Sequence, residues 1–393
     1  MTSFQLIALH ESLYKTKPSL NIFTPGRVNL IGEHIDYNGG LVMPFAITKG
    51  TYVVSSARSD KTINCFSKNF ESLGVISFNI DDYQKENNWA DFVKGAVFEL
   101  GKLGISLPYG LDLTFLGTIP TSSGLSSSAS LEVSIFNIFK DIYNLDLTDE
   151  KIALLSQAIE HDYIGVNCGI MDQFIISCAK DDSVMLLNCA NLEHSYSNFE
   201  LGDYVILIMN SCKKRDLAAS KYNERLAECM KALEIVKKYY DVKDLCSLSV
   251  VDLIKIKDKF DDEVIYKRAL HCVSEIARVK DCYNALNDND LVTVGKLLNQ
   301  SHESLKENYE VSCKELDLLV DTARSINSCL GARMTGAGFG GCAIAIINKD
   351  DVDSAISKIK EEYLEKIGHA CELYVASVAG NTKILEAEKD YEL

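Results

Sequence analysis

The sequence predicts an α/β (α+β) protein of two domains, and three observations lead to this prediction. The chain has 393 residues, and at about 100–200 residues per domain this length predicts two or three domains. The first half alternates strand-like and helix-like segments, whereas a long helix-like stretch fills much of the second half. Apolar residues make up 47% of the chain, which is enough to bury a core in each half. We expect a mixed α/β domain at residues 1–198 and a helix-rich α+β domain at residues 199–393.

Four strands and one helix are predicted up to residue 209. β-Branched or alternating apolar residues indicate strands at 52–57, 111–115, 184–188 and 204–209. A helix is expected from Ser130 onward, because five apolar residues follow at helical spacing on one face. These residues are Leu131, Ile135, Ile138, Phe139 and Ile142.

The second half is predicted to consist mainly of helices. Residues 217–328 are rich in Lys, Glu, Leu and Ala and contain few helix breakers. A glycine-rich loop then leads to strand-like segments at 342–347 and 373–378. The polar stretch 193–202 separates two predicted strands, and we place the domain boundary there.

Charge and hydropathy exclude several classes of partner. The chain has 40 Lys and Arg against 56 Asp and Glu, a formal charge of −16, whereas nucleic acids and anionic membranes attract basic surfaces. No apolar run reaches the length that crosses a bilayer, and residues 1–20 have no signal-peptide core. The 13 cysteines include no Cys-x-x-Cys pair, which favours reduced thiols over a disulfide scaffold or a zinc ribbon. We expect a soluble, cytoplasmic chain that binds neither nucleic acid nor membrane.

A serine-rich cluster at residues 120–130 is the first candidate functional segment. It reads Pro-Thr-Ser-Ser-Gly-Leu-Ser-Ser-Ser-Ala-Ser and lies between the strand at 111–115 and the helix from Ser130. Free N–H groups at the positive end of a helix dipole, next to hydroxyl groups, can bind phosphate or a metal ion. A flexible linker or a simple helix cap is the alternative, but the segment is short for a linker.

A second cluster, residues 331–341, contains the pattern G-x-G-x-x-G at Gly336, Gly338 and Gly341. The dinucleotide fingerprint requires a strand, a turn and then a helix. Here the loop precedes a predicted strand, so we reject a nicotinamide site. We expect instead a close approach of this backbone to a ligand or to another loop.

A third cluster, residues 24–40, combines a cation, two carboxylates and an imidazole between glycines. Glu33, His34 and Asp36 lack a second histidine and match no zinc spacing. Carboxylates and an imidazole can instead pair with several hydroxyl groups of a polyol. A hydrogen-bonded turn without a ligand is the alternative. The sequence contains neither a P-loop nor the His-Arg-Asp and Asp-Phe-Gly signatures of protein kinases.

Six sequence blocks, taken together, resemble the galactokinases of the GHMP small-molecule kinase family. Residues 25–40 look like the galactokinase signature, 120–130 like the ATP loop and 331–341 like the third family motif. The other blocks are Gly169-Ile170-Met171-Asp172-Gln173, Ser220-Lys221-Tyr222-Asn223-Glu224-Arg225 and residues 301–317. They follow the family's order from about residue 20 to 345, so the resemblance covers nearly the whole chain.

The resemblance implies a two-domain GHMP-kinase-like fold with the active site in the inter-domain cleft. It implies that galactose and ATP give galactose 1-phosphate and ADP, with Asp172 facing the anomeric hydroxyl and Arg27 beside it and the transferred phosphate. Such a carboxylate and such a cation suit phosphoryl transfer, which depends on positioning and charge stabilisation. By similarity, the sugar would be held by Glu33, His34, Asp36, Gly169 and Tyr222.

The resemblance also implies sites for Mg²⁺ and ATP. Ser128 and Glu160 would bind Mg²⁺, an ion that prefers oxygen ligands. Ser67 and Trp89 would lie near the nucleotide base. A monomer without an obligate protein partner is expected. The loop around the phosphates would comprise Ser122, Ser123, Gly124, Leu125, Ser126, Ser127 and Ser128.

The sequence departs from the family pattern at three places. Ile35 replaces a frequent Thr within the signature, Ser122 and Ser123 replace frequent glycines, and Arg215 replaces a frequent His. Ile35 leaves N-acetylgalactosamine and other sugars open as substrates. A sugar- and ATP-binding sensor without turnover, and a mevalonate or homoserine kinase, are further alternatives.

Two other basic features are given no ligand. His302, within residues 301–317, is expected to make structural hydrogen bonds. The basic run Lys213-Lys214-Arg215 is as consistent with a solvated turn as with a contact to phosphates.

Overall fold

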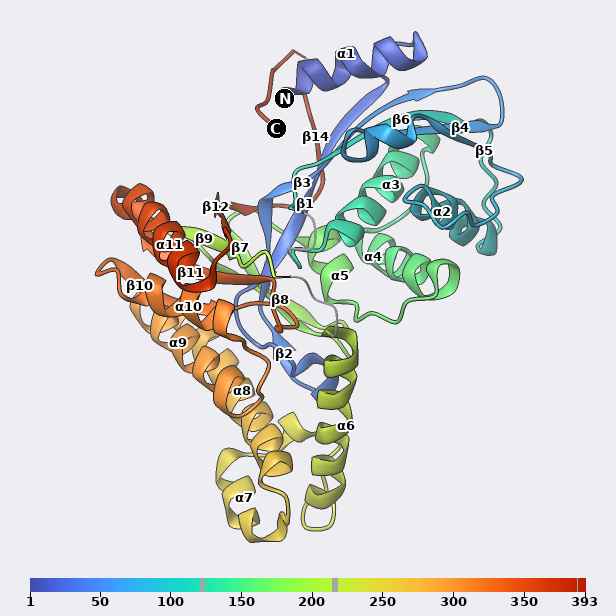
Figure 1. Ribbon diagram of the computed structural model, residues 1–393. Helices are drawn as coiled ribbons and strands as arrows, with labels where there is room; N and C mark the ends of the chain where they lie inside the picture. The colour runs from blue at the N-terminus through green and yellow to red at the C-terminus, as the bar shows by residue number, and fades with distance from the viewer. Residues whose placement is uncertain (121–123, 214–217, 387) are drawn as a thin grey trace.

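The computed structural model describes residues 1–120, 124–213, 218–386 and 388–393, without the side chains of 218–220. Its elements form two lobes joined by long central strands (Figure 1). The first lobe contains a seven-stranded sheet of order β14-β1-β3-β6-β4-β5, with β13 paired to β3. These strands are β1 (Leu20–Asn29), β3 (Pro44–Ala57), β4 (Thr62–Ser67), β5 (Ile76–Asn79), β6 (Leu111–Gly117), β13 (Val378–Ala379) and β14 (Lys383–Ile384).

Helices cover both faces of this sheet. Successive side chains of a strand point to opposite faces, so apolar neighbours on β3 pack against helices on both sides. On β3, Val53 packs in the core formed with the helices of one face, whereas Tyr52 and Val54 contact Leu6 of α1 (Ser3–Tyr14) on the other face. The first group of helices comprises α2 (Asp91–Lys102), α3 (Ser127–Tyr143), α4 (Asp149–Ala158) and α5 (Met171–Cys178), with a π-helical turn η3 (Ile159–Ile164) after α4.

The second lobe is built on a four-stranded antiparallel sheet of order β10-β11-β9-β12. Its strands are β9 (Tyr204–Asn210), β10 (Cys329–Met334), β11 (Cys342–Asn348) and β12 (Glu372–Ala376). A three-stranded sheet of order β2-β7-β8 contains β2 (Leu41–Val42), β7 (Ser183–Asn188) and β8 (His194–Asn198). The helices are α6 (Ala218–Val236), α7 (Val250–Lys255), α8 (Glu263–Asn287), α9 (Leu291–Glu307), α10 (Lys314–Arg324) and α11 (Val352–Ile367). Short 3₁₀ turns are η1 (Asp36–Asn38), η2 (Lys68–Leu73), η4 (Leu245–Ser247), η5 (Lys257–Lys259) and η6 (Lys349–Asp351).

The hairpin of β1 and β3 contributes to both hydrophobic cores. Ile22 and Val53 lie in the core of the first lobe, whereas Val28 and Phe45 pack in the core of the second. The register of the pair shifts between Pro25 and Gly26, which places an irregularity midway along the hairpin. The segment that follows this shift therefore lies where the two lobes meet.

The structure confirms the predicted fold class and most predicted elements, with two differences. The helix expected from Ser130 begins at Ser127, because the left-handed conformation of Ser126 already ends the preceding loop. The segment expected as one strand at 373–378 is divided into β12 and β13. The polar stretch 193–202 contains β8, and the domain boundary at residue 198 stays a prediction. Among the helices of the described residues, none combines the length and the apolarity that a bilayer requires.

Candidate active site

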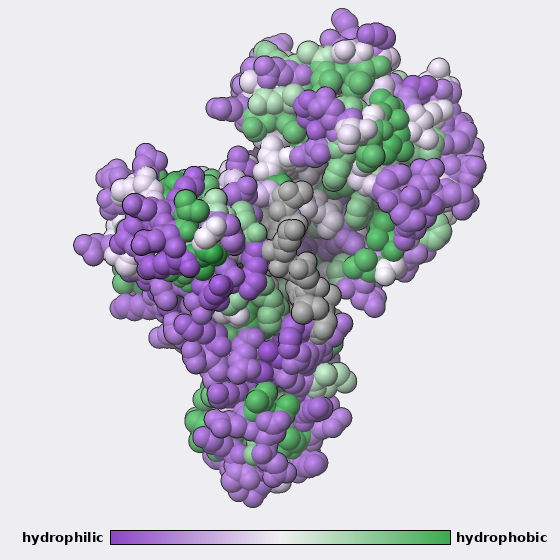
Figure 2. All heavy atoms as spheres, viewed as in Figure 1, coloured by the Kyte–Doolittle hydropathy of each residue, from purple (hydrophilic) through white to green (hydrophobic). Residues whose placement is uncertain are grey.

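A cavity of about 650 Å³ is lined by residues of both lobes, and Figure 2 shows the surface of these lobes with a notch between them. The sequence predicts nine residues for catalysis, sugar binding and metal binding, and all nine line this cavity. They are Arg27, Glu33, His34, Asp36, Ser128, Glu160, Gly169, Asp172 and Tyr222. They come from β1, the loop after it and η1, from α3, η3, α5 and the loop before α5, and from α6 of the second lobe.

Arg27 and Asp172 form a two-pronged ion pair at the wall of the cavity. Arg27 Nε donates to Asp172 Oδ1 at 2.8 Å, and Nη2 donates to Oδ2 at 2.7 Å. The third nitrogen, Nη1, donates to the carbonyl of Gly124 at 2.7 Å. The Arg27 side chain is 8% exposed and that of Asp172 is 30% exposed. A buried cation thus holds a carboxylate that remains open to the cavity.

Local structure explains where these two side chains lie. Arg27 follows the register shift at Gly26, where an added Cβ would lie 2.9 Å from the Leu125 carbonyl oxygen. Glycine therefore lets β1 run directly against the serine-rich loop. Asp172 lies in the first turn of α5, where the helix dipole favours a negative charge.

Ser126 connects the serine-rich loop to Asp172. Its φ of 63° is left-handed, and its hydroxyl donates to Asp172 Oδ2 rather than capping α3. The first N–H groups of α3 have no partner within the helix, and they begin beside Ser127 and Ser128. Of the predicted phosphate loop, Ser128 lines the cavity, Gly124 and Ser126 bind the Arg27–Asp172 pair, and Leu125 is buried in the core. Ser127 lines an adjoining pocket, whereas Ser122 and Ser123 fall outside the described residues.

Asp36, Gly169 and Tyr222 form another part of the cavity wall. A Cβ added to Gly169 would lie 3.5 Å from Asp36 Oδ2, so glycine leaves both the carboxylate and its own backbone accessible. Burial raises the pKa of Asp36 to about 6. Burial also raises the pKa of Tyr222, so its phenol is neutral. Hydroxyl-bearing ligands can therefore find acceptors and a donor here.

Ile35, the residue at which the signature departs from the family pattern, does not line the cavity. It is fully buried in the hydrophobic core of the second lobe, and an added Cβ at Gly40 would contact its side chain at 2.6 Å. The substitution therefore changes the packing behind the signature rather than the surface offered to a ligand.

Glu33 and His34 are held by the glycine-rich segment at residues 331–341. Glu33 Oε1 accepts from Gly336 N at 2.8 Å and from Thr335 Oγ1 at 3.0 Å. Its Oε2 accepts from Asn29 Nδ2 at 2.8 Å and from Arg333. Burial raises the pKa of Glu33, while Arg333 and the Gly336 amide oppose this effect. His34 Nε2 approaches the Ala337 carbonyl oxygen at 3.2 Å. The predicted close approach of this loop to another loop is thus confirmed.

Ser128 and Glu160 lie where oxygen ligands gather. Two further buried oxygens, Glu132 Oε1 and Gln173 Oε1, have no hydrogen-bond partner among the described residues, and Gln173 Nε2 donates to Glu132 Oε2 at 3.1 Å. Burial and the neighbouring Glu160 raise the pKa of Glu132 well above its usual value. The all-oxygen donor set fits Mg²⁺. Within the described part of the chain, no group of three or more His, Cys, Asp or Glu side chains is arranged to hold a metal ion by itself.

Ser67 and Trp89 do not line this cavity but an adjoining apolar pocket of about 200 Å³. Ser128 lines both spaces. The rings of Trp89 and Phe70 are nearly parallel, with an interplanar angle of 11° and centroids 6.5 Å apart. The Trp89 indole nitrogen is buried and finds no hydrogen-bond partner within the described part of the chain. This pocket suits a flat heterocycle that has polar edges.

Sequence reasoning missed several residues that shape the site. Tyr37 and Asn29 line the cavity, whereas Tyr309 and Arg333 support it from behind and are fully buried. One sequence signal could have indicated Arg333: it is a charged residue at an inward position of strand β10. As predicted, His302 makes a structural hydrogen bond, since its Nδ1 accepts from Met334 N at 3.2 Å.

Of the basic run before α6, only Lys213 belongs to the residues that the structure describes. Lys213 Nζ pairs with Glu315 at 2.9 Å, whereas Lys214 and Arg215 fall outside the described residues.

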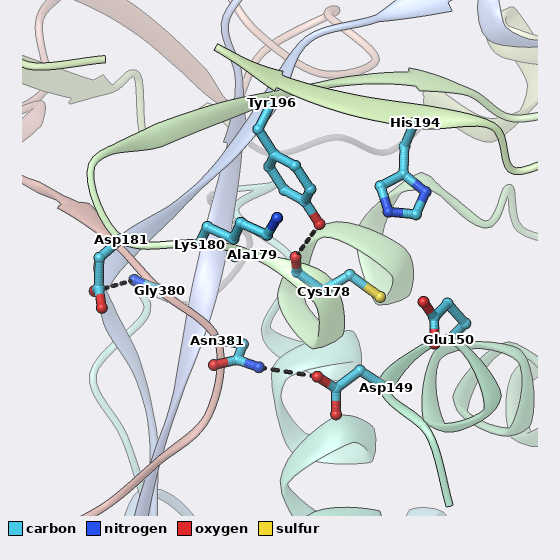
Figure 3. A pocket seen from close by; sticks show the side chains of 10 residues that line it. All are labelled: Asp149, Glu150, Cys178, Ala179, Lys180, Asp181, His194, Tyr196, Gly380 and Asn381. Carbon is cyan, nitrogen blue, oxygen red and sulfur yellow. Dashed lines mark hydrogen bonds between the residues drawn. The ribbon is translucent and has the colours of Figure 1, made fainter. Parts of the chain in front are cut away.

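A separate pocket of about 580 Å³ contains no residue predicted for function (Figure 3). It lies at the opposite end of α5 from Asp172. Tyr196 donates to the Cys178 carbonyl at 2.5 Å, Asn381 Nδ2 donates to Asp149 Oδ2 at 3.2 Å, and Gly380 N donates to Asp181 Oδ1 at 3.0 Å. Three hydrogen bonds thus join residues of its wall to one another.

Comparison with known proteins identifies three family domains in this chain. The galactokinase galactose-binding signature matches residues 8–57, the N-terminal domain of GHMP kinases matches 91–180 and their C-terminal domain matches 282–365. A galactokinase of Clostridium perfringens is 47% identical over 364 residues, which are 92% of this chain and 94% of that protein. A galactokinase of Clostridium acetobutylicum is 45% identical over 95% of this chain and 96% of that protein.

Solved structures show the same relationship. The Lactococcus lactis galactokinase complexed with galactose superposes with a TM-score of 0.90 at 41% identity and covers 97% of this chain and 99% of that one. A mevalonate kinase superposes with a TM-score of 0.67 at 22% identity, over 92% of this chain and 100% of that one. At that identity, the second likeness concerns the fold alone.

Proposed function

Because the chain belongs to the galactokinase family of the GHMP kinases, we propose that it transfers the terminal phosphoryl group of ATP to the anomeric hydroxyl of galactose. The products are galactose 1-phosphate and ADP. The observation that carries the proposal is the Arg27–Asp172 pair, which faces a polar cavity next to the N-terminus of α3. The sugar signature and the serine-rich loop meet at that pair.

In the proposed reaction, Asp172 orients the sugar hydroxyl and Arg27 stabilises the transferred phosphoryl group. Among the residues that the structure describes, Oδ2 of Asp172 accepts from Arg27 Nη2 and from Ser126, whereas Oδ1 accepts from Arg27 Nε alone. Oδ1 therefore has the free lone pair that can accept the anomeric hydroxyl proton. Phosphoryl transfer depends mainly on positioning and charge stabilisation, and a guanidinium fixed by three hydrogen bonds supplies both.

We assign sugar recognition to Asp36, Gly169, Tyr222 and Glu33, with His34 lining the same wall. Asp36 and Tyr222 offer an acceptor and a donor to neighbouring hydroxyl groups, and Gly169 offers its backbone. A buried polar group left unpaired by the wrong stereoisomer costs about 1–3 kcal/mol. Glucose differs from galactose in one hydroxyl orientation, so such a wall is suited to discriminate between them.

ATP would place its phosphates at the start of α3 and its base in the pocket of Ser67 and Trp89. The free N–H groups of α3 and the hydroxyls of Ser127 and Ser128 support the first assignment. The parallel rings of Trp89 and Phe70 support the second. Ser128 and Glu160 would hold Mg²⁺ in part, and the phosphates would complete its ligand shell. When bound, the ion neutralises phosphate charge.

The proposal includes a reducing cytoplasmic environment and a monomeric enzyme. The 13 cysteines without a Cys-x-x-Cys pair support a reducing compartment.

Turnover with a panel of sugars tests the function. We expect ADP release with galactose in the presence of Mg²⁺ and ATP, kcat/KM for glucose lower by roughly 10⁴, and an intermediate value for N-acetylgalactosamine. Equal kcat/KM for glucose and galactose would refute the recognition by hydroxyl pairing. Preference for N-acetylgalactosamine would reassign the substrate. Binding of galactose and ATP without ADP release would identify a sensor.

A further inference from the structure

The imidazole of His34 has no hydrogen-bonding capacity left for a sugar. Nδ1 lies 2.8 Å from the hydroxyl of Tyr37, and Nε2 lies 3.2 Å from the carbonyl oxygen of Ala337. Each imidazole nitrogen makes one hydrogen bond, so both nitrogens are occupied. A carboxylate differs, because each oxygen has two lone pairs, and Glu33 can share its oxygens among several donors.

The carbonyl of Ala337 fixes the direction of a chain of hydrogen bonds. A carbonyl only accepts, so Nε2 of His34 must carry the proton and Nδ1 must accept from the hydroxyl of Tyr37. The Tyr37 oxygen then accepts from Tyr309, whose hydroxyl lies 2.9 Å away. The Tyr309 oxygen is left to accept from the thiol of Cys229 at 3.0 Å. The hydrogen-bond chain thus runs through four side chains, and its last acceptor is a backbone carbonyl of the glycine-rich segment 331–341. The four side chains are Cys229, Tyr309, Tyr37 and His34.

The surroundings of His34 prevent the ring from turning toward a ligand. It is 4% exposed and contacts the rings of Tyr37, Tyr222 and Tyr309, with centroids 4.9–6.0 Å away. Its backbone is left-handed, with φ of 63°. Burial lowers the pKa of His34 to about 3, and the neighbouring His271, Arg225 and Arg333 lower it further, against the hydrogen bond to Ala337. The imidazole is therefore neutral at physiological pH.

We propose that the His34 side chain is a positioning residue and not a sugar ligand: it fastens the Thr335–Ala337 segment to the galactose signature. This inference rests on the proposed function and refines the role of one residue in it. Glu33 binds the same segment through Thr335 and Gly336. On its other side, Gly336 borders the serine-rich loop, since an added Cβ would lie 3.9 Å from the Gly124 carbonyl oxygen. The fastened segment thus supports both the sugar wall and the proposed phosphate loop.

Two variants of equal size separate the two roles. His34→Gln keeps an N–H donor within reach of Ala337, whereas His34→Leu fills similar space without one, and both carry the same Cβ strain at a left-handed residue. We expect His34→Leu to raise KM for both galactose and ATP by about tenfold or more, because it leaves a buried carbonyl unpaired. His34→Gln should stay within about threefold of the wild type. His369→Leu, at an exposed histidine, is the control.

Monodeoxygalactoses then test for direct contact. If His34 binds a hydroxyl group, His34→Leu loses its effect on the sugar that lacks that hydroxyl. We expect the loss in kcat/KM to be the same, within about twofold, for galactose and for its 2-, 3-, 4- and 6-deoxy derivatives. A deoxy sugar that abolishes the loss overturns the proposal, and so does a rise of KM confined to galactose.

The wild-type protein provides a measurement that does not depend on a variant's folding. Long-range ¹H–¹⁵N spectra show which imidazole nitrogen carries the proton, and the signal absent from His34→Gln identifies the residue. We expect a neutral His34 protonated at Nε2 between about pH 5 and 8, with and without saturating galactose. A change of tautomer or protonation upon adding galactose overturns the inference. If no signal of the protein responds to galactose, the proposed function fails instead.

Discussion

Arg27 and Asp172 depend on each other at the scale of single residues, because one guanidinium binds both carboxylate oxygens. Asp172→Asn should keep galactose and ATP binding within a few-fold, while kcat falls by roughly 10²–10⁴, the range for a positioned acid/base group. Steady-state kinetics and calorimetry measure the two effects. Asp258→Asn, at an exposed aspartate, should change neither. A variant that retains more than about a tenth of wild-type kcat would remove Asp172 from this role.

Arg27 itself should not tolerate a lysine. An ammonium cannot reproduce three hydrogen bonds in a fixed plane, two to Asp172 and one to the Gly124 carbonyl. We expect Arg27→Lys to lower kcat by at least roughly 10²-fold, because charge stabilisation and positioning are lost together. The same kinetic assay measures this. Near-normal kcat would mean that a point charge suffices.

Asp36 makes sugar recognition dependent on pH. Burial raises its pKa from 3.8 to about 6, so the folded protein protonates Asp36 as pH falls through about 6. A protonated carboxyl is a weaker acceptor for sugar hydroxyls, and kcat/KM for galactose should therefore fall below this pH. Because the folded pKa lies above the unfolded one, the same group favours folding at low pH and loses that contribution as pH rises through about 6. A pH profile of kcat/KM tests this, and Asp36→Asn should lack this limb. A wild-type profile that stays flat between about pH 5 and 7 would contradict it.

Glu160 should affect the metal more than the sugar. Glu160→Gln removes a charge from the proposed Mg²⁺ site, so we expect a higher Mg²⁺ concentration for half-maximal rate and little change in galactose KM. Glu150→Gln, on an exposed position of α4, is the matched control. An unchanged Mg²⁺ titration would mean that Glu160 is structural.

At the scale of elements, the contact of β1 with the serine-rich loop requires a glycine. The Cβ of Gly26→Ala would lie 2.7 Å from Ile119 Cδ1 and 2.9 Å from the Leu125 carbonyl oxygen, so the loop must move away from Arg27. We expect KM for ATP to rise by about tenfold or more, and Tm to fall, as overpacking costs about 1–3 kcal/mol. In Gly101→Ala on α2, the nearest atom lies 3.5 Å away, and this change should preserve KM and Tm. Normal ATP kinetics in Gly26→Ala would show that the loop position is not critical.

At the scale of the whole molecule, the C-terminal segment joins both lobes. It contributes β12 to the sheet of the second lobe and then β13 and β14 to the sheet of the first. Leu385 and Leu393 pack against the cluster of Leu6, Tyr52 and Val54. In Figure 1 the two termini lie close together, and Thr2 pairs with Glu392.

Removal of residues 382–393 should therefore weaken the first lobe more than the active site. The deletion exposes the Leu6 cluster and frees the edge of β1, so we expect Tm to fall by a few degrees. In a chain of 393 residues, each kcal/mol of lost stability lowers Tm by about 1 °C. At a temperature well below the new Tm, kcat should stay near the wild-type value. Thermal melts with kinetics measure both. An unchanged Tm would show that the segment adds no stability.

The sequence by itself determined the chemistry and most local structure of this protein. The strands at 52–57, 111–115 and 204–209 follow from apolar patterns of a few residues, and the motifs around Arg27, Ser128 and Asp172 are local enough to be recognised directly. The nine predicted site residues are separated by up to about two hundred positions, yet the family order of their motifs indicated one site. The start of α3 at Ser127 was missed because it depends on the left-handed backbone of Ser126. The spacing of apolar residues, on which the prediction relied, does not indicate that conformation.

Only the tertiary structure decided which polar atoms remain available to ligands. Glu33 is bound by Thr335, 302 positions away, and His34 is bound by Ala337, 303 positions away. The local sequence does not indicate such contacts, because they form only where the β1–β3 pair packs against the loop before β11. Ile35, adjacent to these residues in sequence, turns into the core for the same reason. Composition and spacing name the groups of an active site, whereas packing determines which of them face the substrate.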